Sequence, residues 1–505
     1  MKTLTKRLTA LLLAFVAAIG FSFSVFAANG TEDLQTELLA ELPSVAAKAA
    51  AEEPQSKEAA AVYPIVYLSG FGSQLYTQAS TDPQAYFDWL LDDGGLVDSV
   101  WVGLGKTALK VLYTPWLWWL PNLLADAVCE FMSAAFGPIA CDEEGNTVHD
   151  VANNHRNYPL RYALVYGRQM FEFHYDWRMD PWDTAVELRA YIDDVLAGTG
   201  AAKVEIDTIS YGTNVVCAYL EQYGTAGLNS VFFGVSAAGG VPLVEELLQK
   251  HLETNVPAIL DFAASATGNA AMSGRSEQMF DIATFLSDFS WVYPLLRSSA
   301  VAWTLGTLLN GFLWLLEDYL YNNALIPFFA QWPGLWSMVA DDSAYENAKA
   351  VLLKGEKYAV LRDKIDRYHY NVAIRADEII QDAAEEIKVG VLAAYGYAAI
   401  PAGAYTSYQG DMLIGSARES FGAIVAPYGE TLGENYEQAV ADGVDHLSPD
   451  GEVDASTCAL PNQTWFFKGY VHKNDYRQAG MYAWFLDSSQ PRVCEDYPQF
   501  TEYWW

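Results

Sequence analysis

A serine stands between a strand-like run and a helix-like run near the middle of this chain. The strand-like run is Lys203–Asp207 and the helix-like run is Thr213–Leu220, with only Thr208–Gly212 between them. Such a sharp turn lifts the hydroxyl of Ser210 clear of the sheet and directs the first N–H groups of the helix toward a developing oxyanion. The pattern is that of a nucleophile elbow, in which a strand runs directly into a helix.

The elbow departs from the usual G-x-S-x-G pattern at one position, because Thr208 replaces the first glycine. Two other interpretations stay open. Ser210 could be an ordinary helix N-cap, a role that serine often fills. A second serine, Ser236, lies in the similar stretch Gly234–Ala238, but the following Gly239 and Gly240 disfavour a helix there.

Strand-like and helix-like runs alternate around the elbow. Further strands are expected at Tyr63–Leu68, Met170–Trp177, Ser230–Val235 and Val389–Tyr395, and a helix at Trp182–Leu196. Asp180 is the expected N-cap of that helix, with Pro181 at its first position. This alternation predicts a mostly parallel sheet with helices on both faces. Together with the elbow, it predicts an α/β class, specifically an α/β-hydrolase core with helical, aromatic-rich lid and cap insertions.

The composition along the chain predicts five segments. They are a signal peptide (1–27), an Ala/Glu-rich linker (28–60), a first part of the core (61–260) with a lid-like insertion at about 95–150, a helical cap (261–385), and a second part of the core (386–505). The lid-like insertion contains Trp116, Trp118 and Trp119, which are either core residues or lipid contacts. In the cap, Ser298–Leu316 is uncharged and nominally long enough to span a membrane. Its Gly, Asn, Ser and Thr residues favour a buried or interface-lying helix.

The N-terminus and the charge of the chain indicate where it acts. Lys2, Lys6 and Arg7 precede an apolar run and the small-residue site Val25–Ala27, as in a signal peptide, although an uncleaved anchor is the alternative. We therefore expect a secreted or cell-surface protein. A net charge of −34 argues against nucleic-acid partners and against electrostatic attraction to anionic lipid. Any peripheral membrane contact must therefore be apolar, through the lid and cap.

Export would permit disulfide bonds. The chain has five cysteines. Cys217, on the apolar helix after the elbow, is expected to be a free, buried thiol. The other four could pair as Cys129–Cys141 and Cys458–Cys494, although the connectivity is not fixed by sequence.

A serine nucleophile needs a histidine base and an acid that orients it, in the chain order serine, acid, histidine. His446 and His472 both follow the last expected strand. The turn Asp450–Val453 offers an acid 22 residues before His472, with Asp454 as the second candidate. His446 precedes Asp450, which is the wrong order. Asp450 also stands in a Pro-Asp-Gly sequence, which is a turn signal in its own right.

Several segments resemble the lecithin:cholesterol acyltransferase family. Tyr175–Pro181 is similar to the family's Y-D-W-R-x-x-P signature, and Leu68–Leu75 to its oxyanion loop, one residue shorter and with Ser69 in place of proline. Pro333–Trp336, followed by Tyr345 and Glu346, resembles part of the family's cap. The similarity covers roughly residues 62–475.

This resemblance implies acyl transfer from a lipid ester, such as a phospholipid, to water or an acceptor alcohol. It implies Ser210 as nucleophile, His472 as base and Asp450 as acid, with the N–H groups of Phe71 and Tyr211 as the oxyanion hole. Gly70 and Gly212 would shape this site. Asp176 and Arg178, on either side of Trp177, are expected to form a structural ion pair rather than to take part in chemistry.

Two other functions remain open: a catalytically silent protein that binds lipid or a surface, and a secreted esterase for non-lipid esters. No phosphate-binding glycine loop or convincing metal-ligand spacing is present in the sequence, so we expect no metal or other cofactor.

Overall fold

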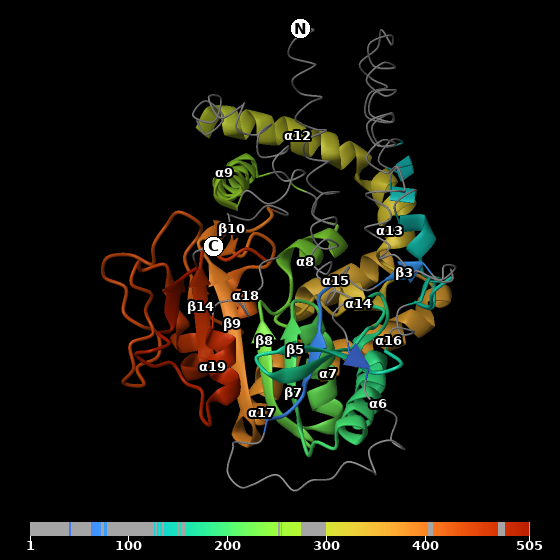
Figure 1. Cartoon of the computed structure of the whole chain (residues 1–505). Coiled ribbons are helices and arrows are strands. Elements are labelled where there is room, and N and C mark those ends of the chain that lie inside the picture. The colour runs from blue at the N-terminus through green and yellow to red at the C-terminus, as the bar shows by residue number, and fades with distance from the viewer. Residues whose placement is uncertain are drawn as a thin grey trace, which may run out of the picture.

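A mostly parallel β-sheet forms the centre of the computed structural model (Figure 1). The structure describes residues 40–41, 62–71, 75–77, 126, 129–130, 132–133, 136–148, 151–152, 157–250, 253, 255–273, 299–401, 408–472 and 480–503. Within them, nine strands lie in the order β1 (Ala40–Glu41), β5 (Arg161–Val165), β6 (Arg168–Glu172), β2 (Ile65–Leu68), β7 (Val204–Ile209), β8 (Leu228–Gly234), β9 (Lys388–Tyr395), β14 (Thr464–Lys468) and β15 (Phe500–Glu502). All neighbouring pairs from β6 to β15 are parallel, and β1–β5 and β5–β6 are antiparallel. The expected α/β class with a mostly parallel sheet is confirmed.

Apolar side chains alternate between the two faces of this sheet. On β8, Phe233 joins the core beneath α6 (Pro181–Thr199), α7 (Gly212–Tyr223) and α17 (Ala376–Glu386), whereas Phe232 packs against α19 (Met481–Asp487). Because neighbouring side chains on a strand point to opposite faces, one strand supplies both cores. The sheet is therefore buried on both sides.

The first helix after the antiparallel strands begins where the sequence predicts. The side chain of Asp180 accepts a hydrogen bond from the backbone N–H of Trp182 at 2.9 Å, and Pro181 is the first helical residue. Gly200, with φ of 73°, ends α6 in the left-handed conformation that favours glycine. The expected capping of this helix is confirmed.

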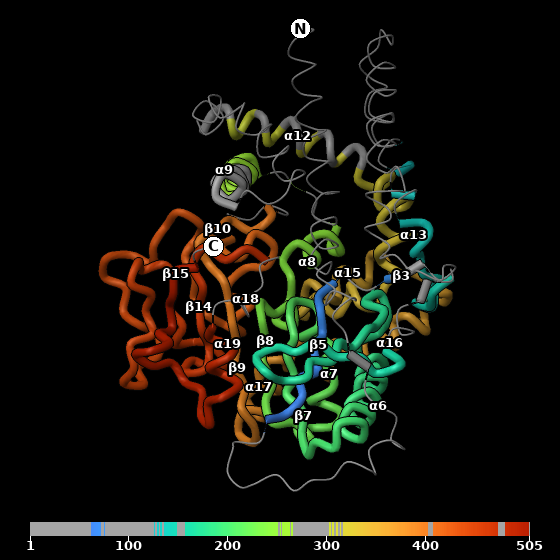
Figure 2. Tube along the Cα trace, viewed as in Figure 1, coloured from blue at the N-terminus to red at the C-terminus, as the bar shows by residue number. Residues whose placement is uncertain are grey.

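The described part of the long connection between β8 and β9 is mostly helical. Besides α17 and two 3-10 turns, it contains α8 (Pro242–Leu248), α9 (Val256–Ser273), α12 (Ser299–Leu320), a π-helix (Tyr321–Leu325), α13 (Ile326–Phe328), α14 (Pro333–Trp336), α15 (Asp342–Leu352) and α16 (Ala359–Asn371). Figure 1 and the trace in Figure 2 show α9 and α12 above the sheet, at the opposite end of the molecule from α17. Among the helices that the structure describes, none has the length and apolarity needed to cross a membrane.

Short elements complete the described part of the chain. They are β3 (Tyr76–Thr77), β4 (Val151–Ala152), β10 (Tyr397–Ala398), β11 (Gln409–Gly410), α18 (Ser416–Glu419), β12 (Ile424–Val425), β13 (Val453–Asp454), and 3-10 turns at Gly137–Ile139, Glu356–Tyr358, Ala373–Arg375, Ala455–Thr457 and Pro461–Gln463. The signal peptide, the linker apart from β1, and most of the lid-like insertion with Trp116, Trp118 and Trp119 lie outside the described residues.

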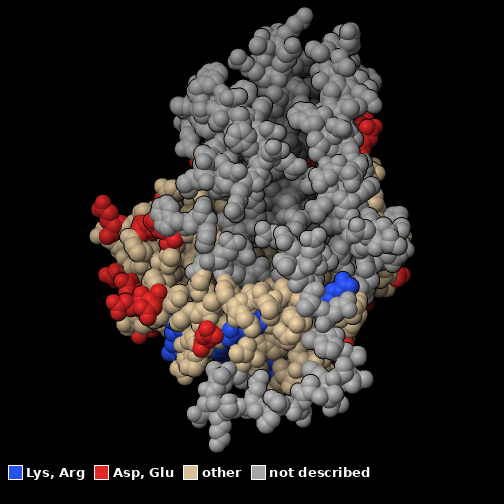
Figure 3. Space-filling view, in the orientation of Figure 1, with Lys and Arg blue, Asp and Glu red and all other residues tan. Residues whose placement is uncertain are grey.

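Acidic side chains gather on the surface beside the C-terminal strands. Figure 3 shows them on the part of the molecule that carries β14 and β15. Exposed acidic residues of the C-terminal part of the described chain include Glu430, Glu434, Glu437, Asp442, Asp445, Asp487, Glu495, Asp496 and Glu502. Their clustering accords with the negative charge of the whole chain.

The buried carboxylate of Glu205 forms ion pairs that link three strands near their amino ends. Nε of Arg168, on β6, lies 3.0 Å from Oε2 of Glu205 on β7, and Nζ of Lys388 on β9 lies 3.8 Å from Oε1 of the same carboxylate. Arg168 and Glu205 are both buried. Because β2 lies between β6 and β7, the pair joins strands that are not neighbours.

Removing one partner of this pair should strongly destabilise the fold. We expect Arg168→Met to lower the free energy of unfolding by about 3 kcal/mol, since Glu205 would then lose its main cation inside the protein. The double variant Arg168→Met/Glu205→Met should recover most of that loss, and urea unfolding of the three proteins measures both changes. Equal stability of the single variant and the wild type would contradict this role.

Candidate active site

Ser210 occupies the turn between β7 and α7 in a strained backbone conformation. Its φ is 54°, in the left-handed region that residues other than glycine seldom adopt. Its N–H donates to the carbonyl of Gly234 at 3.0 Å, and its carbonyl accepts from the N–H of Thr213 at 3.1 Å. These bonds tie the turn to both the neighbouring strand and the helix, as a nucleophile elbow requires.

Two glycines let other backbone segments approach this turn. A Cβ on Gly212 would lie 2.6 Å from Oγ1 of Thr208 and 2.8 Å from the carbonyl oxygen of Leu68. A Cβ on Gly70 would lie 2.9 Å from Cβ of Ser210. Thr208 is thus accommodated because Gly212 leaves space for its hydroxyl, and the loop after β2 lies directly against the serine.

His472 faces Ser210 from the loop after β14. Its Nε2 lies 2.9 Å from Oγ of Ser210, and both residues are almost fully buried. Its backbone N–H donates to the carbonyl of Asp411 at 3.0 Å. The structure therefore brings together the serine and the histidine that the sequence singles out.

The carboxylate beside His472 belongs to Asp411. Oδ2 of Asp411 is hydrogen-bonded to Nδ1 of His472, and Oδ1 accepts the N–H groups of Leu413 at 2.9 Å and Ile414 at 2.8 Å. Burial opposes ionisation of Asp411, but the charge of His472 and these hydrogen bonds together hold its pKa below the usual value. Asp411 is thus an ionised acid aimed at the imidazole.

The prediction that Asp450 orients His472 is wrong. Oδ2 of Asp450 accepts from Nζ of Lys468 at 2.7 Å, and Oδ1 accepts from the hydroxyl of Ser448 at 2.6 Å. Both carboxylate oxygens of Asp450 are therefore used in a turn and in an ion pair with Lys468. Nothing in the local sequence reveals that lysine as its partner.

The other candidate residues of this region have structural partners. The carboxylate of Asp454 accepts from the hydroxyl of Tyr436 and the N–H of Ala439, both at 2.8 Å, and caps a 3-10 turn through the N–H of Ser456. Nδ1 of His446 lies 2.7 Å from Oε1 of Gln499. The exclusion of His446 from the site is consistent with this geometry.

A signal for Asp411 is present in the sequence. Asp411 lies between the expected strand Val389–Tyr395 and His472, so it also satisfies the order serine, acid, histidine. It follows β11 in a tight turn whose N–H groups bind its carboxylate. A search for acids between those two points would have included it.

The second serine has a structural role. The hydroxyl of Ser236 donates to Oγ1 of Thr213 at 3.0 Å and accepts from the N–H of Ala238 at 3.1 Å. The next helix, α8, does not begin until Pro242. Ser236 therefore braces the start of α7 instead of standing at an elbow of its own.

The expected oxyanion residues lie around the elbow. The ring of Phe71 packs against Trp177, with centroids 3.9 Å apart, and against Tyr211, with centroids 5.8 Å apart. Tyr211 directly follows Ser210 and is the residue before the first turn of α7. Their backbone N–H groups as oxyanion donors remain a prediction that this arrangement favours.

The segment Tyr175–Arg178 holds the loop that carries Phe71. The hydroxyl of Tyr175 donates to the carbonyl of Ser69, and Arg178, fully buried, pairs with Asp176 through its Nε at 2.9 Å. Arg178 also donates to the carbonyl of Ile139 at 2.7 Å. The Asp176–Arg178 ion pair is therefore present as expected, as a brace between loops.

The same segment contacts the α14 turn. A Cβ on Gly334 would lie 2.0 Å from the carbonyl oxygen of Trp177 and 2.6 Å from the hydroxyl of Tyr211. The N–H of Gly334 donates to the carbonyl of Arg178 at 2.9 Å. The segment that follows β6 and the turn at α14 thus pack directly on each other beside the elbow.

The five cysteines form no disulfide bond in the structure, which corrects the pairings Cys129–Cys141 and Cys458–Cys494. Burial raises the pKa of the Cys141 and Cys458 thiols to about 12, so both are protonated at neutral pH. Sequence spacing could not reveal the directions of these side chains, on which a bridge depends. Cys217 is a free, buried thiol, as expected.

One group of potential metal ligands stands out in the described part of the chain: Asp411, Glu419 and His472, whose ligand atoms lie within 4.8 Å of one another. Both ring nitrogens of His472 already form hydrogen bonds, one to Asp411 and one to Ser210. A metal ion would have to displace the first of these bonds. The arrangement matches proton transfer between serine, histidine and carboxylate better than metal coordination.

Comparisons with known proteins give little independent evidence. No family model and no curated protein matches this chain. A search of solved structures finds a chain of "The crystal structure of Tle4-Tli4 complex", with a TM-score of 0.20 and 13% sequence identity. The match covers 37% of this chain and 48% of that one, so this chain spans about half of the solved chain's length. A likeness of this size carries no argument about function.

The close approach at Gly212 can be tested by adding one methyl group. We expect Gly212→Ala to lower the free energy of unfolding by about 1–3 kcal/mol, because two of the three atoms that the methyl would meet are backbone carbonyl oxygens. Gly311→Ala, in α12 with no atom near its Cβ, is the matched control and should be neutral or slightly stabilising. Thermal unfolding compares the two, and an equally tolerated Gly212→Ala would contradict the tight elbow.

Proposed function

We propose that this protein is a serine acyl-hydrolase or acyltransferase of the α/β-hydrolase type, acting on lipid esters through an acyl-enzyme. The observation that carries the proposal is the buried row of hydrogen bonds from Ser210 through His472 to Asp411. Its serine stands at a left-handed strand-to-helix turn, where its hydroxyl can reach a carbonyl. Chain order and geometry both accord with a catalytic triad.

In the proposed reaction, Oγ of Ser210 attacks the ester carbonyl while Nε2 of His472 takes the hydroxyl proton. Asp411 holds the imidazole in the required tautomer through Nδ1 and stabilises the imidazolium that forms. The N–H groups of Phe71 and Tyr211 would receive the oxyanion. His472 then returns the proton to the leaving alcohol, and water or an acceptor alcohol releases the acyl group by the reverse route.

Support for a lipid substrate comes from the cap and from the resemblance of several segments to lecithin:cholesterol acyltransferases. In α12, Trp303 is 73% exposed and Trp314 is 75% exposed. They are eleven residues, or about three helical turns, apart, so they lie on the same face of the helix. Large exposed aromatic side chains suit contact with an apolar surface, and they do not depend on attraction to anionic lipid. We also propose that the protein is secreted or held at the cell surface, from its N-terminal pattern.

The triad assignment predicts different results for two aspartates. Asp411→Asn should lower kcat by about 10³–10⁴, because the amide stabilises the wrong histidine tautomer and cannot balance the imidazolium. Asp450→Asn should retain kcat within about threefold. The measurement is turnover of a short-chain nitrophenyl ester, with labelling by a fluorophosphonate probe as a second readout. Wild-type protein that labels no better than Ser210→Ala would rule out the serine mechanism.

The exposed face of α12 predicts an interfacial effect. We expect the double variant Trp303→Ser/Trp314→Ser to reduce hydrolysis of phosphatidylcholine vesicles about tenfold or more, because two large apolar contacts are lost. Its turnover of a soluble short-chain ester should stay near wild type. Leu164→Ser, which changes an exposed residue on β5, is the control. A preference of the wild type for soluble acetate esters over vesicles would favour a non-lipid esterase instead.

A further inference from the structure

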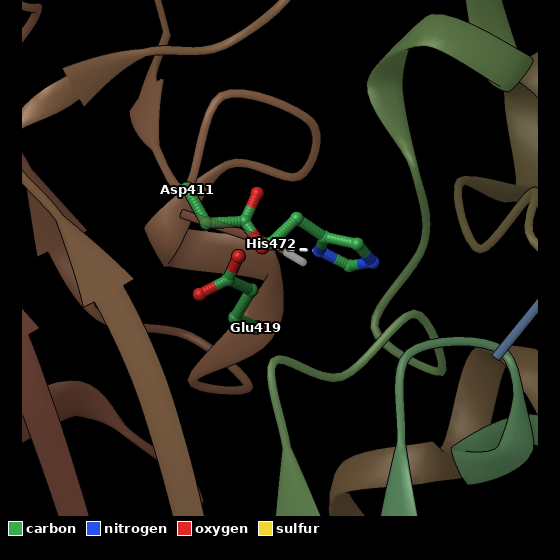
Figure 4. Close-up of side chains that lie close together, drawn as sticks. All are labelled: Asp411, Glu419 and His472. Carbon is green, nitrogen blue, oxygen red and sulfur yellow. Dashed lines mark hydrogen bonds and ion pairs between the residues drawn. The ribbon is translucent and has the colours of Figure 1, made fainter. Parts of the chain in front are cut away.

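A second carboxyl group lies beside Asp411, next to the proposed triad. Glu419 ends the short helix α18 and has no exposed surface. Figure 4 shows its carboxyl group next to that of Asp411, while the imidazole of His472 extends to the other side. Two carboxyl groups this close cannot readily both carry a negative charge inside the protein.

Hydrogen bonds identify Asp411 as the ionised member of this pair. Its carboxylate accepts three donors: the N–H groups of Leu413 and Ile414 and Nδ1 of His472. Each of these bonds favours the charged form. These three bonds therefore stabilise the unprotonated carboxylate of Asp411.

Glu419 has a different environment. Its Oε2 accepts the backbone N–H of Ala394, on β9, at 2.6 Å, whereas its Oε1 is buried and has no donor. The neighbouring cation, Arg418, is directed to Glu245 at 2.9 Å and to the carbonyl of Gly239, so it does not neutralise Glu419. Within the described part of the chain, Glu419 is grouped with two other titratable side chains, those of Asp411 and His472.

We propose that Glu419 is a positioning residue of the active site, carrying a proton on Oε1 that it donates to the Asp411 carboxylate. This bond gives the buried Oε1 a partner and gives Asp411 a fourth donor. It fixes the plane of the Asp411 carboxylate against Nδ1 of His472, and so fixes the direction of Nε2 toward Ser210. The inference rests on the proposed function of the triad, since its effect on catalysis passes through His472.

The electrostatics agree with this division of roles. Burial, followed by the charge of Asp411, raises the pKa of Glu419 well above its usual value. The pKa of Asp411 lies below its usual value, so the two shifts favour a proton on Glu419 and a negative charge on Asp411. The pair of Glu419 and Asp411 thus carries one negative charge instead of two, on the carboxylate that faces Nδ1 of His472.

The test compares two substitutions of similar size. In Glu419→Gln the side-chain carbonyl can still accept from Ala394, and the NH₂ group can still donate to Asp411. In Glu419→Met the shape is similar but the donor is lost. We expect the Gln variant to keep kcat within about threefold and the Met variant to lose about tenfold in kcat with KM little changed, as expected for one lost hydrogen bond. Thermal unfolding of both variants verifies that they are folded.

Two kinetic results would overturn the proposal. A Met variant with wild-type kcat would show that Glu419 only fills space. A Gln variant as impaired as the Met variant would show that a negative charge or a bound cation is needed at this position, and loss of wild-type activity with a chelator would support the cation.

A readout that does not need turnover separates this inference from the proposed function. The NMR resonance of the proton between Nδ1 of His472 and Asp411 reports the strength of that bond directly. It should stay in place in Glu419→Gln and shift in Glu419→Met. If the wild type reacts with no ester or fluorophosphonate, the proposed function fails, yet this resonance still decides whether Glu419 supports Asp411. An unchanged resonance in the folded Met variant would refute the hydrogen bond.

Discussion

The left-handed backbone of Ser210 is the constraint on which the surrounding structure depends. A non-glycine residue at positive φ costs about 1–2 kcal/mol, so its surroundings must hold it in place. Here the N–H of Ser210 bonds to Gly234, and its carbonyl accepts from both Thr213 and Ala237. The turn is thereby fixed between β7, β8 and α7. Gly212 allows the loop after β2 to approach, because any side chain there would collide with backbone oxygens.

The parallel sheet explains how three remote positions of the chain meet. Residues 210, 411 and 472 follow β7, β9 and β14, and the carboxyl ends of parallel strands lie at one edge of a sheet. These strands are paired in one sheet: Thr208 pairs with Phe233, Phe233 with Val391, and Val391 with Thr464. The opposite edge carries the Arg168–Glu205 ion pair. The fold thus separates a structural polar cluster from the one that can perform chemistry.

The sequence alone predicts the parts of the site that depend on a local pattern of residues. The strand, turn and helix around Ser210 are consecutive in the chain, and His472 follows a recognisable apolar strand. The acid could not be located in the same way, because Asp411 and Asp450 both satisfy the required order. What distinguishes them is tertiary structure: Lys468 binds Asp450, whereas Leu413, Ile414 and His472 bind Asp411. The cysteine pairings failed for a similar reason, since the directions of side chains on separate segments are set by packing.

Burial of Ser210, His472 and Asp411 strengthens the interaction between the carboxylate and the imidazole. Asp411 is fully buried, so its interaction with His472 is screened by protein rather than by water and is correspondingly stronger. In the reaction that we propose, the proton that His472 takes from Ser210 would give the imidazole a positive charge beside the Asp411 carboxylate, and burial strengthens the attraction between the two. The same burial makes a second negative charge next to Asp411 costly. A residue that keeps Asp411 oriented without adding such a charge preserves this attraction, and the protonated carboxyl that we propose at position 419 would meet that requirement.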